Sequence, residues 1–235
     1  MLANFTANCF HQRVSRIIVI TGTDTGVGKT LLTAQLARHL RGRGMRVAAL
    51  KPLCSGGRDD ARALHRALGG TLTLDEINPW HFRAPLTPLL AARMEKRRVL
   101  LREVTAQVRR LAKRFDVVLV EGAGGLLSPL GKNFSTRELI ETLDAEVFIA
   151  AQNRLGVVNH LRLTLEALPS RLAPLARIVL MSPKKADAAS RTNLALLAEF
   201  ISENRVVAFP FLPKPEILSP SATIRIRRAL ASLLD

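Results

Sequence analysis

Residues Arg16–Thr30 read RIIVITGTDTGVGKT, and this stretch decides the fold class. A β-branched run, a loop rich in Gly and Thr, and an apolar helical pattern follow one another along the chain. This order is the context of a phosphate-binding loop, in which backbone N–H groups surround an anion at a helix N-terminus. Lys29 would then reach the terminal phosphates, and the Thr30 hydroxyl would hold Mg²⁺.

The loop departs from the commonest spacing by one residue. Counting back from Gly28, the standard loop has its first glycine at position 23, where this chain has Thr23. Gly22 takes that place, so the loop is one residue longer. A chance Gly-rich turn is the competing interpretation. The agreement of strand, loop, Gly-Lys-Thr and helix argues against it.

Length and composition favour a single compact α/β unit. The chain has 235 residues, of which 48% are hydrophobic, and no apolar run approaches the length of a membrane helix. We expect a flexible leader at 1–15 and one domain over 16–235. Cys9 and Cys54 make no disulfide framework or metal pattern, so we expect a cytoplasmic protein. The lack of a membrane-length apolar run predicts no membrane partner.

The formal net charge of +16 is unusually high. Basic residues cluster at 38–46, 93–114 and 225–228. Such a balance raises nucleic-acid binding as an alternative. Most of these arginines stand at helical spacing beside Leu and Ala, however, and aromatic residues make up only 4% of the chain, so stacking platforms for bases are scarce. We therefore interpret the clusters as solvated helix faces.

Strands and helices alternate along the sequence. Predicted strands are at 17–21, 46–51, 116–121, 145–151, 176–181 and 206–209. Predicted helices are at 29–41, 59–68, 101–114, 136–142, 157–168, 190–202 and 222–234. Segments such as VVLV are apolar throughout rather than alternating, as in a parallel sheet covered on both faces. The pattern predicts a doubly wound, mostly parallel sheet flanked by helices, with ligands at the carboxyl ends of its strands.

Charged residues follow several of these strands. Lys51 ends the second strand and is suited to stabilise a transferring phosphoryl group, although a surface lysine fits the spacing equally well. Asp60 opens the next helix, where a capping role competes with a role as a Mg²⁺ ligand. Glu121 ends a buried-type strand before GAGG, and a buried carboxylate there needs a metal or a lysine partner.

A second potential anion site follows the fourth strand. Residues 154–160 read RLGVVNH and begin a helix, whose N–H groups suit a carboxylate. His160 by itself is best explained as a structural residue.

Together these residues resemble the dethiobiotin synthetase family. The motifs that carry the resemblance are GTDTGVGKT at 22–30, KPLCSG at 51–56, DA at 60–61, NPWHFRAPLTP at 78–88, VEGAGG at 120–125 and LGVVNH at 155–160. They stand in the family's order over about residues 16–213. The resemblance implies a P-loop NTPase fold of the type shared with MinD.

The resemblance also implies an activity, the ATP- and Mg²⁺-dependent conversion of 7,8-diaminopelargonate and CO₂ to dethiobiotin in biotin biosynthesis. An amine would take up CO₂ as a carbamate, ATP would phosphorylate it to a carbamic-phosphoric anhydride, and the second amine would close the ring. Lys29 and Lys51 would stabilise the phosphates and the carbamate. Thr25 and Ser55 would contact the carbamate or the γ-phosphate. Phosphoryl transfer of this kind needs positioning and charge neutralisation.

The other residue roles come from the same resemblance. Mg²⁺ would be held by Thr30, Asp60 and Glu121. The nucleotide would be bound by Asp24, Thr25, Gly26, Val27, Gly28, Lys29, Thr30, Glu121, Gly124, Ser182, Pro210 and Leu212. The diamine substrate would be bound by Ser55 and Gly124, and its carboxylate by Leu155, Gly156, Val157, Val158 and Asn159 across the interface of a homodimer.

Three positions depart from the family pattern. Gly26 stands where some members carry Glu, and Leu89 stands where His is common. Met181-Ser182 replaces an Asn-containing turn that usually contacts adenine. Met cannot read a base edge through strong hydrogen bonds, so the sequence leaves the nucleotide preference open.

The sequence is also compatible with three alternative functions. One is a diverged paralogue, a P-loop ligase that acts on another acid. A ligase of the cobyrinate amidase type would be an example, but it needs a glutaminase domain, for which this chain has no length left. Another is a ParA- or Mrp-like ATPase that binds nucleic acid or a membrane. Such ATPases carry a lysine five residues before the P-loop lysine, where this chain has Asp24. A non-catalytic nucleotide-binding protein is the third, and the presence of both lysines and both carboxylates disfavours it.

Overall fold

The computed structural model describes residues 15–213 and 220–234. The predicted leader therefore lies outside the described residues, except for Ser15. Within the described ranges, no helix is long and apolar enough to cross a membrane.

A six-stranded parallel sheet forms the centre of the molecule. Its strand order is β2-β5-β1-β6-β7-β8. The strands are β1 (Arg16–Gly22), β2 (Val47–Leu50), β5 (Val117–Glu121), β6 (Glu146–Gln152), β7 (Arg177–Met181) and β8 (Val206–Phe209). β1 lies between β5 and β6, with Ile18 opposite Leu119 on one side and Glu146 on the other. This confirms the predicted parallel α/β sheet.

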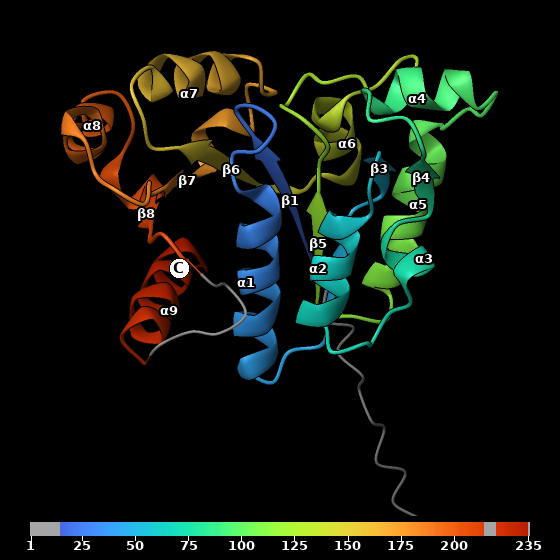
Figure 1. Ribbon diagram of the computed structural model, residues 1–235, viewed down its shortest axis with the longest axis horizontal. Helices are drawn as coiled ribbons and strands as arrows, with labels where there is room; N and C mark the ends of the chain where they lie inside the picture. The colour runs from blue at the N-terminus through green and yellow to red at the C-terminus, as the bar shows by residue number, and fades with distance from the viewer. Residues whose placement is uncertain (1–14, 214–219, 235) are drawn as a thin grey trace, which may run out of the picture.

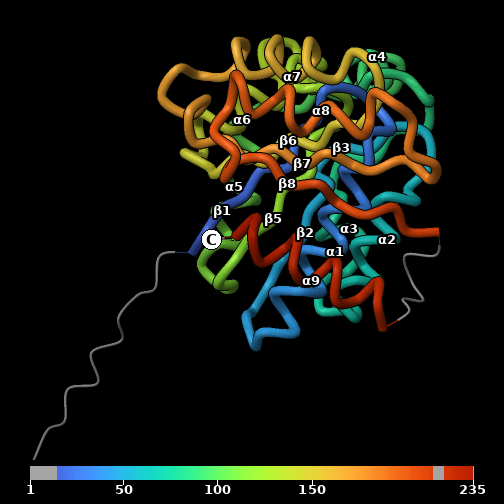
Figure 2. Tube along the Cα trace, turned by 90° about the vertical axis from the view of Figure 1, so that its left-hand side faces the viewer, coloured from blue at the N-terminus to red at the C-terminus, as the bar shows by residue number. Residues whose placement is uncertain are grey.

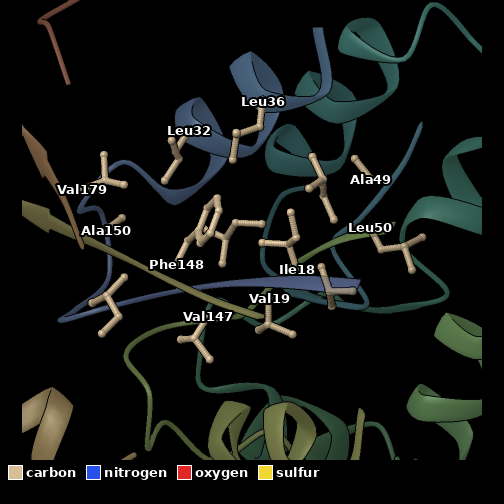
Figure 3. Close-up of a cluster of buried hydrophobic side chains, with 14 of the residues drawn as sticks. Ile18, Val19, Leu32, Leu36, Ala49, Leu50, Val147, Phe148, Ala150 and Val179 are labelled. Carbon is tan, nitrogen blue, oxygen red and sulfur yellow. The ribbon is translucent and has the colours of Figure 1, made fainter. Parts of the chain in front are cut away.

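The core lies on both faces of β1. Ile18, Val19 and Ile20 have no exposed surface, and Figure 3 shows side chains above and below the strand. Leu32 and Leu36 cover one face from the neighbouring helix. An uninterrupted run of β-branched residues suits this strand because neither face meets water.

Helices cover both faces of the sheet (Figures 1 and 2). One face carries α1 (Lys29–Gly42), α2 (Asp59–Ala67) and α9 (Pro220–Leu234). The other carries α5 (Leu101–Ala112), α6 (Thr136–Leu143), α7 (Val157–Glu166) and α8 (Ala188–Ala198). Short 3-10 turns at Ala173–Leu175 and Glu203–Arg205 precede β7 and β8.

Some short elements were not predicted from the sequence. β3 (Leu53–Ser55) pairs in parallel with β4 (Trp80–Phe82) in a two-stranded sheet, and α3 (Leu74–Ile77) and α4 (Pro88–Met94) flank it. Elements of three to seven residues show too little periodicity to be recognised.

The helix predicted at 190–202 is shifted toward the N-terminus. It begins at Ala188, because the Asp187 side chain accepts a hydrogen bond from the Ser190 N–H and caps the helix. It ends at Ala198, and the backbone then turns toward β8.

Candidate functional site

The phosphate-binding loop connects β1 to α1. Gly26 and Gly28 have φ values of 71° and 98°, a left-handed conformation that favours glycine. A Cβ at Gly22 would approach Val27 Cγ2 to 2.6 Å, so the shifted glycine fits closely against its own loop. Gly22 itself is the last residue of β1, and the loop begins at Thr23.

Lys29 is buried in the first turn of α1. Its Nζ donates a 2.7 Å hydrogen bond to the Asp24 carbonyl, within the loop. Burial, followed by the positive charge of Lys51, lowers the pKa of Lys29 to about 8. A desolvated ammonium beside a second cation interacts favourably with any phosphate that enters the loop.

The ends of β2 and β5 and the first turn of α1 bring an ammonium, a carboxylate and a hydroxyl together. Thr30 Oγ1 donates to Glu121 Oε1 at 2.7 Å, and Lys51 Nζ donates to the same oxygen at 2.6 Å. Lys51 Nζ also lies 3.0 Å from Asp60 Oδ2 and 3.1 Å from the Gly122 carbonyl. The parallel pairing of β2, β5 and β1 explains this convergence, because the three carboxyl ends share one edge of the sheet.

Lys51 is buried between its two carboxylates, so the interpretation as a surface lysine is wrong. Burial alone acts to lower its pKa, but Glu121 and Asp60 outweigh burial and raise it. Burial likewise acts to raise the pKa of Asp60, and Lys51 reverses the direction so that this pKa is lowered. Lys51 and Asp60 are therefore both charged at neutral pH. Asp60 points to Lys51, while Asp59 pairs with Arg62.

The donor set at these strand ends suits a hard cation. Glu121 Oε2 is buried without a hydrogen-bond partner, and Thr30 and Asp60 supply further oxygens nearby. The described ranges contain no group of three His, Cys, Asp or Glu residues that could enclose a metal by themselves. Mg²⁺ commonly takes one or two carboxylates and completes its shell with water and phosphate oxygens, so the residues fit it.

A cavity of about 400 Å³ opens beside Lys51. Thr25, Ser55 and Gly124, all predicted to contact the substrate or phosphate, line it together with Asp60. Gly124 has a φ of 72°, and a Cβ there would collide with Ser128 Oγ, which accepts a hydrogen bond from the Gly125 N–H. The structure thus brings these predicted residues to one cavity.

A second cavity, of about 430 Å³, adjoins the other side of the phosphate-binding loop. Its lining includes the predicted nucleotide-binding residues Gly26, Val27, Gly28, Ser182, Pro210 and Leu212. Sequence reasoning missed Gln152, whose Nε2 donates to the Gly26 carbonyl at 3.1 Å, and Phe211. Met181 also lines this cavity, and a Cβ at Gly28 would approach its Cε to 2.9 Å. The Met181 side chain thus fills space directly beside the loop.

The segment predicted to bind the substrate carboxylate, 155–159, does not line the Lys51 cavity of the same chain. Leu155 is 83% exposed, and Gly156, with a φ of 88°, precedes the start of α7. The segment 155–159 is absent from the lining of both cavities described above. A smaller cavity of about 320 Å³, lined by Asp24, Ser128 and His160, lies on the α7 side.

Sequence reasoning also missed a buried asparagine that holds the Lys51 segment. Asn78 is 1% exposed, and its Nδ2 donates to the Lys51 carbonyl at 2.9 Å and to the Pro52 carbonyl at 3.2 Å. Its Oδ1 accepts a 3.1 Å hydrogen bond from Arg58 Nε. Two signals pointed to this position: Asn before Pro favours a turn, and Asn78 begins the NPWHFRAPLTP motif at 78–88.

A parallel sheet with a strand–loop–helix phosphate site at its carboxyl edge defines a P-loop NTPase. The AAA domain family matches residues 16–216. Solved structures share the fold: the MinC:MinD cell division complex of Aquifex aeolicus aligns at a TM-score of 0.59 and 17% identity, over 94% of this chain and 96% of that chain. Cobyrinic acid a,c-diamide synthase of Mycobacterium smegmatis, solved with ADP and magnesium, aligns at a TM-score of 0.54 and 19% identity, over 94% of each chain.

Curated relatives narrow the class. An ATP-dependent dethiobiotin synthetase of Anaeromyxobacter dehalogenans is 40% identical over 93% of this chain and 97% of that protein. The ATP-dependent dethiobiotin synthetase of Akkermansia muciniphila is 36% identical over 79% of this chain and 87% of that protein. The chain belongs to the dethiobiotin synthetase family, whose members are ATP-dependent ligases that form C–N bonds in biotin biosynthesis.

Proposed function

We propose that this chain converts 7,8-diaminopelargonate and CO₂ to dethiobiotin with ATP and Mg²⁺. The observation that carries the proposal is the placement of Lys51, buried against Glu121 and Asp60 and facing the same cavity as Thr25 and Ser55. This cavity adjoins the phosphate-binding loop, so an acceptor bound there lies next to the γ-phosphate.

The reaction proceeds in three balanced steps. One amine of the diamine adds to CO₂ and loses a proton, which gives a carbamate. A carbamate oxygen attacks the γ-phosphorus, the bond to the β-phosphate oxygen breaks, and ADP leaves. The second amine attacks the carbamoyl carbon, loses a proton and expels phosphate, which closes the cyclic urea.

The chain's own residues position these groups and neutralise their charge. Lys29 and Lys51 face the negative charge that builds on the transferring phosphoryl group and the carbamate. Thr25 and Ser55 orient the carbamate by hydrogen bonds, and the backbone at Gly124 leaves room for the diamine. Thr30, Asp60 and Glu121 would hold Mg²⁺, which would supply further neutralisation of the phosphate charge.

We also propose that two copies of the chain associate to complete the site. The start of α7 offers N–H groups for the substrate carboxylate but lies away from the Lys51 cavity of its own chain. Leu127, Leu155 and Leu163 are exposed in the same region, which supports an interface there. Sedimentation of Leu163→Asp against the parent chain tests this, since a dimer should dissociate and lose diamine affinity.

The test of function is a product assay. Purified protein is mixed with 7,8-diaminopelargonate, bicarbonate and MgATP, MgCTP or MgGTP, and dethiobiotin is measured by mass spectrometry. Product matched by an equal amount of nucleoside diphosphate supports the proposal, and the three nucleotides report the effect of Met181. Folded protein that hydrolyses ATP but gives no product would instead favour a paralogue that acts on another acid.

A further inference from the structure

Two basic clusters that the proposed function leaves unused meet on one side of the sheet. α1, which carries the cluster that begins at Arg38, contacts α9, which carries 225–228 (Figure 1, blue and red helices). A groove of about 350 Å³ lies between them, lined by Arg38, His39 and Arg43 on one side and Arg227 on the other. Residues that are far apart in sequence thus form one cationic surface.

The charge of this groove is not balanced by the helices that form it. Neither α1, at 29–42, nor α9, at 220–234, contains Asp or Glu. Arg43 and Arg227 make no ion pair with a carboxylate in the described part of the chain, whereas Arg16 and Arg46 elsewhere each do. Arg41 turns away and donates to the Ala67 carbonyl.

His39 reports the electrostatic potential inside the groove. Its Nε2 is a buried atom with no hydrogen-bond partner among the described residues. Burial, then the positive charges of Arg43 and Arg227, lower the pKa of His39. An anion placed among these groups would offset the repulsion and offer an acceptor to the imidazole.

The groove also has an apolar floor. Ile226 and Leu230 of α9 line it and are buried. Guanidinium groups bind phosphate in a planar, two-point geometry, and apolar side chains suit the organic part of a small ligand. The volume is that of a small-molecule site rather than an extended track.

We propose that the α1–α9 groove binds a small phosphorylated molecule, with its phosphate between Arg43 and Arg227 and its organic part over Ile226 and Leu230. This site is separate from the phosphate-binding loop, because Arg38 lies nine residues along α1 from Lys29, about 13 Å along the helix axis. A nucleic-acid backbone carries the same phosphate chemistry and is distinguished by the test.

The experiment uses the NMR signal of the His39 imidazole in the full-length protein, assigned with His39→Gln. Inorganic pyrophosphate and AMP are titrated separately. Because the His39 signal reports on the groove itself, binding of either molecule at the phosphate-binding loop does not obscure it. We expect a saturable shift and a higher pKa of His39. The double variant Arg43→Gln/Arg227→Gln should weaken this binding at least about tenfold, because each lost guanidinium removes charge-assisted hydrogen bonds.

The matched control is Arg93→Gln/Arg102→Gln, which removes the same charge from exposed positions far along the chain. It should leave the His39 titration unchanged. A shift that grows without saturation, is reproduced by sodium chloride at equal ionic strength, or persists in the Arg43/Arg227 variant would overturn the proposal. A shift caused by a single-stranded oligonucleotide but by neither small phosphate would overturn it in favour of nucleic acid.

Discussion

The side-chain amide of Asn78 donates a 2.9 Å hydrogen bond to the main-chain carbonyl of Lys51. Arg58, which immediately precedes α2, donates in turn to the Asn78 side chain and to its carbonyl. The buried amide therefore joins the end of β2 to the helix start that presents Asp60. Two walls of the candidate active site are held in register by one side chain.

Replacing Asn78 with Leu tests this role. The change removes the amide donor to the buried Lys51 carbonyl and the side-chain acceptor of Arg58 Nε, so the free energy of unfolding should fall by about 1–3 kcal/mol. Urea unfolding measures the loss, and kcat should fall more than ATP affinity. Asn204→Leu, at an exposed position, is the control. Equal stability of both variants would contradict a positioning role.

Lys51→Ala should separate nucleotide binding from chemistry. The ammonium faces the acceptor cavity rather than the nucleotide cavity, so ATP should still bind while turnover drops about 10²–10³-fold. Binding of a fluorescent ATP analogue and dethiobiotin formation measure the two effects. Lys113→Ala, exposed after α5, controls for loss of one charge. Near-normal turnover in Lys51→Ala would refute the assigned role.

Gly28→Ala should weaken nucleotide binding for two separable reasons. The new Cβ would approach Met181 Cε to 2.9 Å, and the φ of 98° strains any L-residue. The double variant Gly28→Ala/Met181→Ala removes the clash but keeps the strain. We expect partial recovery of ADP affinity, measured by calorimetry. Full recovery would show that backbone strain contributes nothing.

The lowered pKa of Lys29 gives nucleotide binding a pH dependence. With a pKa of about 8, set first by burial, the free protein loses this positive charge as pH rises through that value. ADP affinity should therefore decline between pH 7 and pH 9.5, approaching about tenfold per unit above the pKa. Calorimetry across this range measures it. A flat profile would show that Lys29 stays charged throughout.

The same pKa sets the sign of a stability effect. Lys29 in the folded chain binds fewer protons than in the unfolded chain between about pH 8 and 10.5. Stability from this group therefore increases with pH across that window. The Lys51 pKa is shifted in the opposite direction, so this residue does not titrate there.

The sequence was sufficient where local pattern and burial agree. The apolar run at 117–120 belongs to a buried parallel strand, and the glycines of the phosphate-binding loop mark its turn directly. Asn78 illustrates what pattern misses. Nothing in its residue type signals burial or its partners, because Lys51 follows β2 and Arg58 precedes α2, and only the fold brings these segments together.

The order of the strands in the sheet could not be predicted from the sequence either. VVLV predicts a strand but not its neighbours, and its place between β2 and β1 follows from packing across the whole sheet. Likewise, the sequence left a metal and a lysine as alternative partners for Glu121. The structure shows that the pairing of β2 with β5 places Lys51 beside this carboxylate.

The position of β1 between β5 and β6 has a consequence for biosynthesis. Thr30 and Glu121, which share a hydrogen bond in the finished fold, are 91 residues apart, so a ribosome makes the first long before the second. Until β5 emerges, the apolar edge of β1 has no strand to pair with. The nascent chain therefore carries this unpaired edge until about half of it has been made, and the nucleotide cavity, which Pro210 lines, is complete only near the end of synthesis.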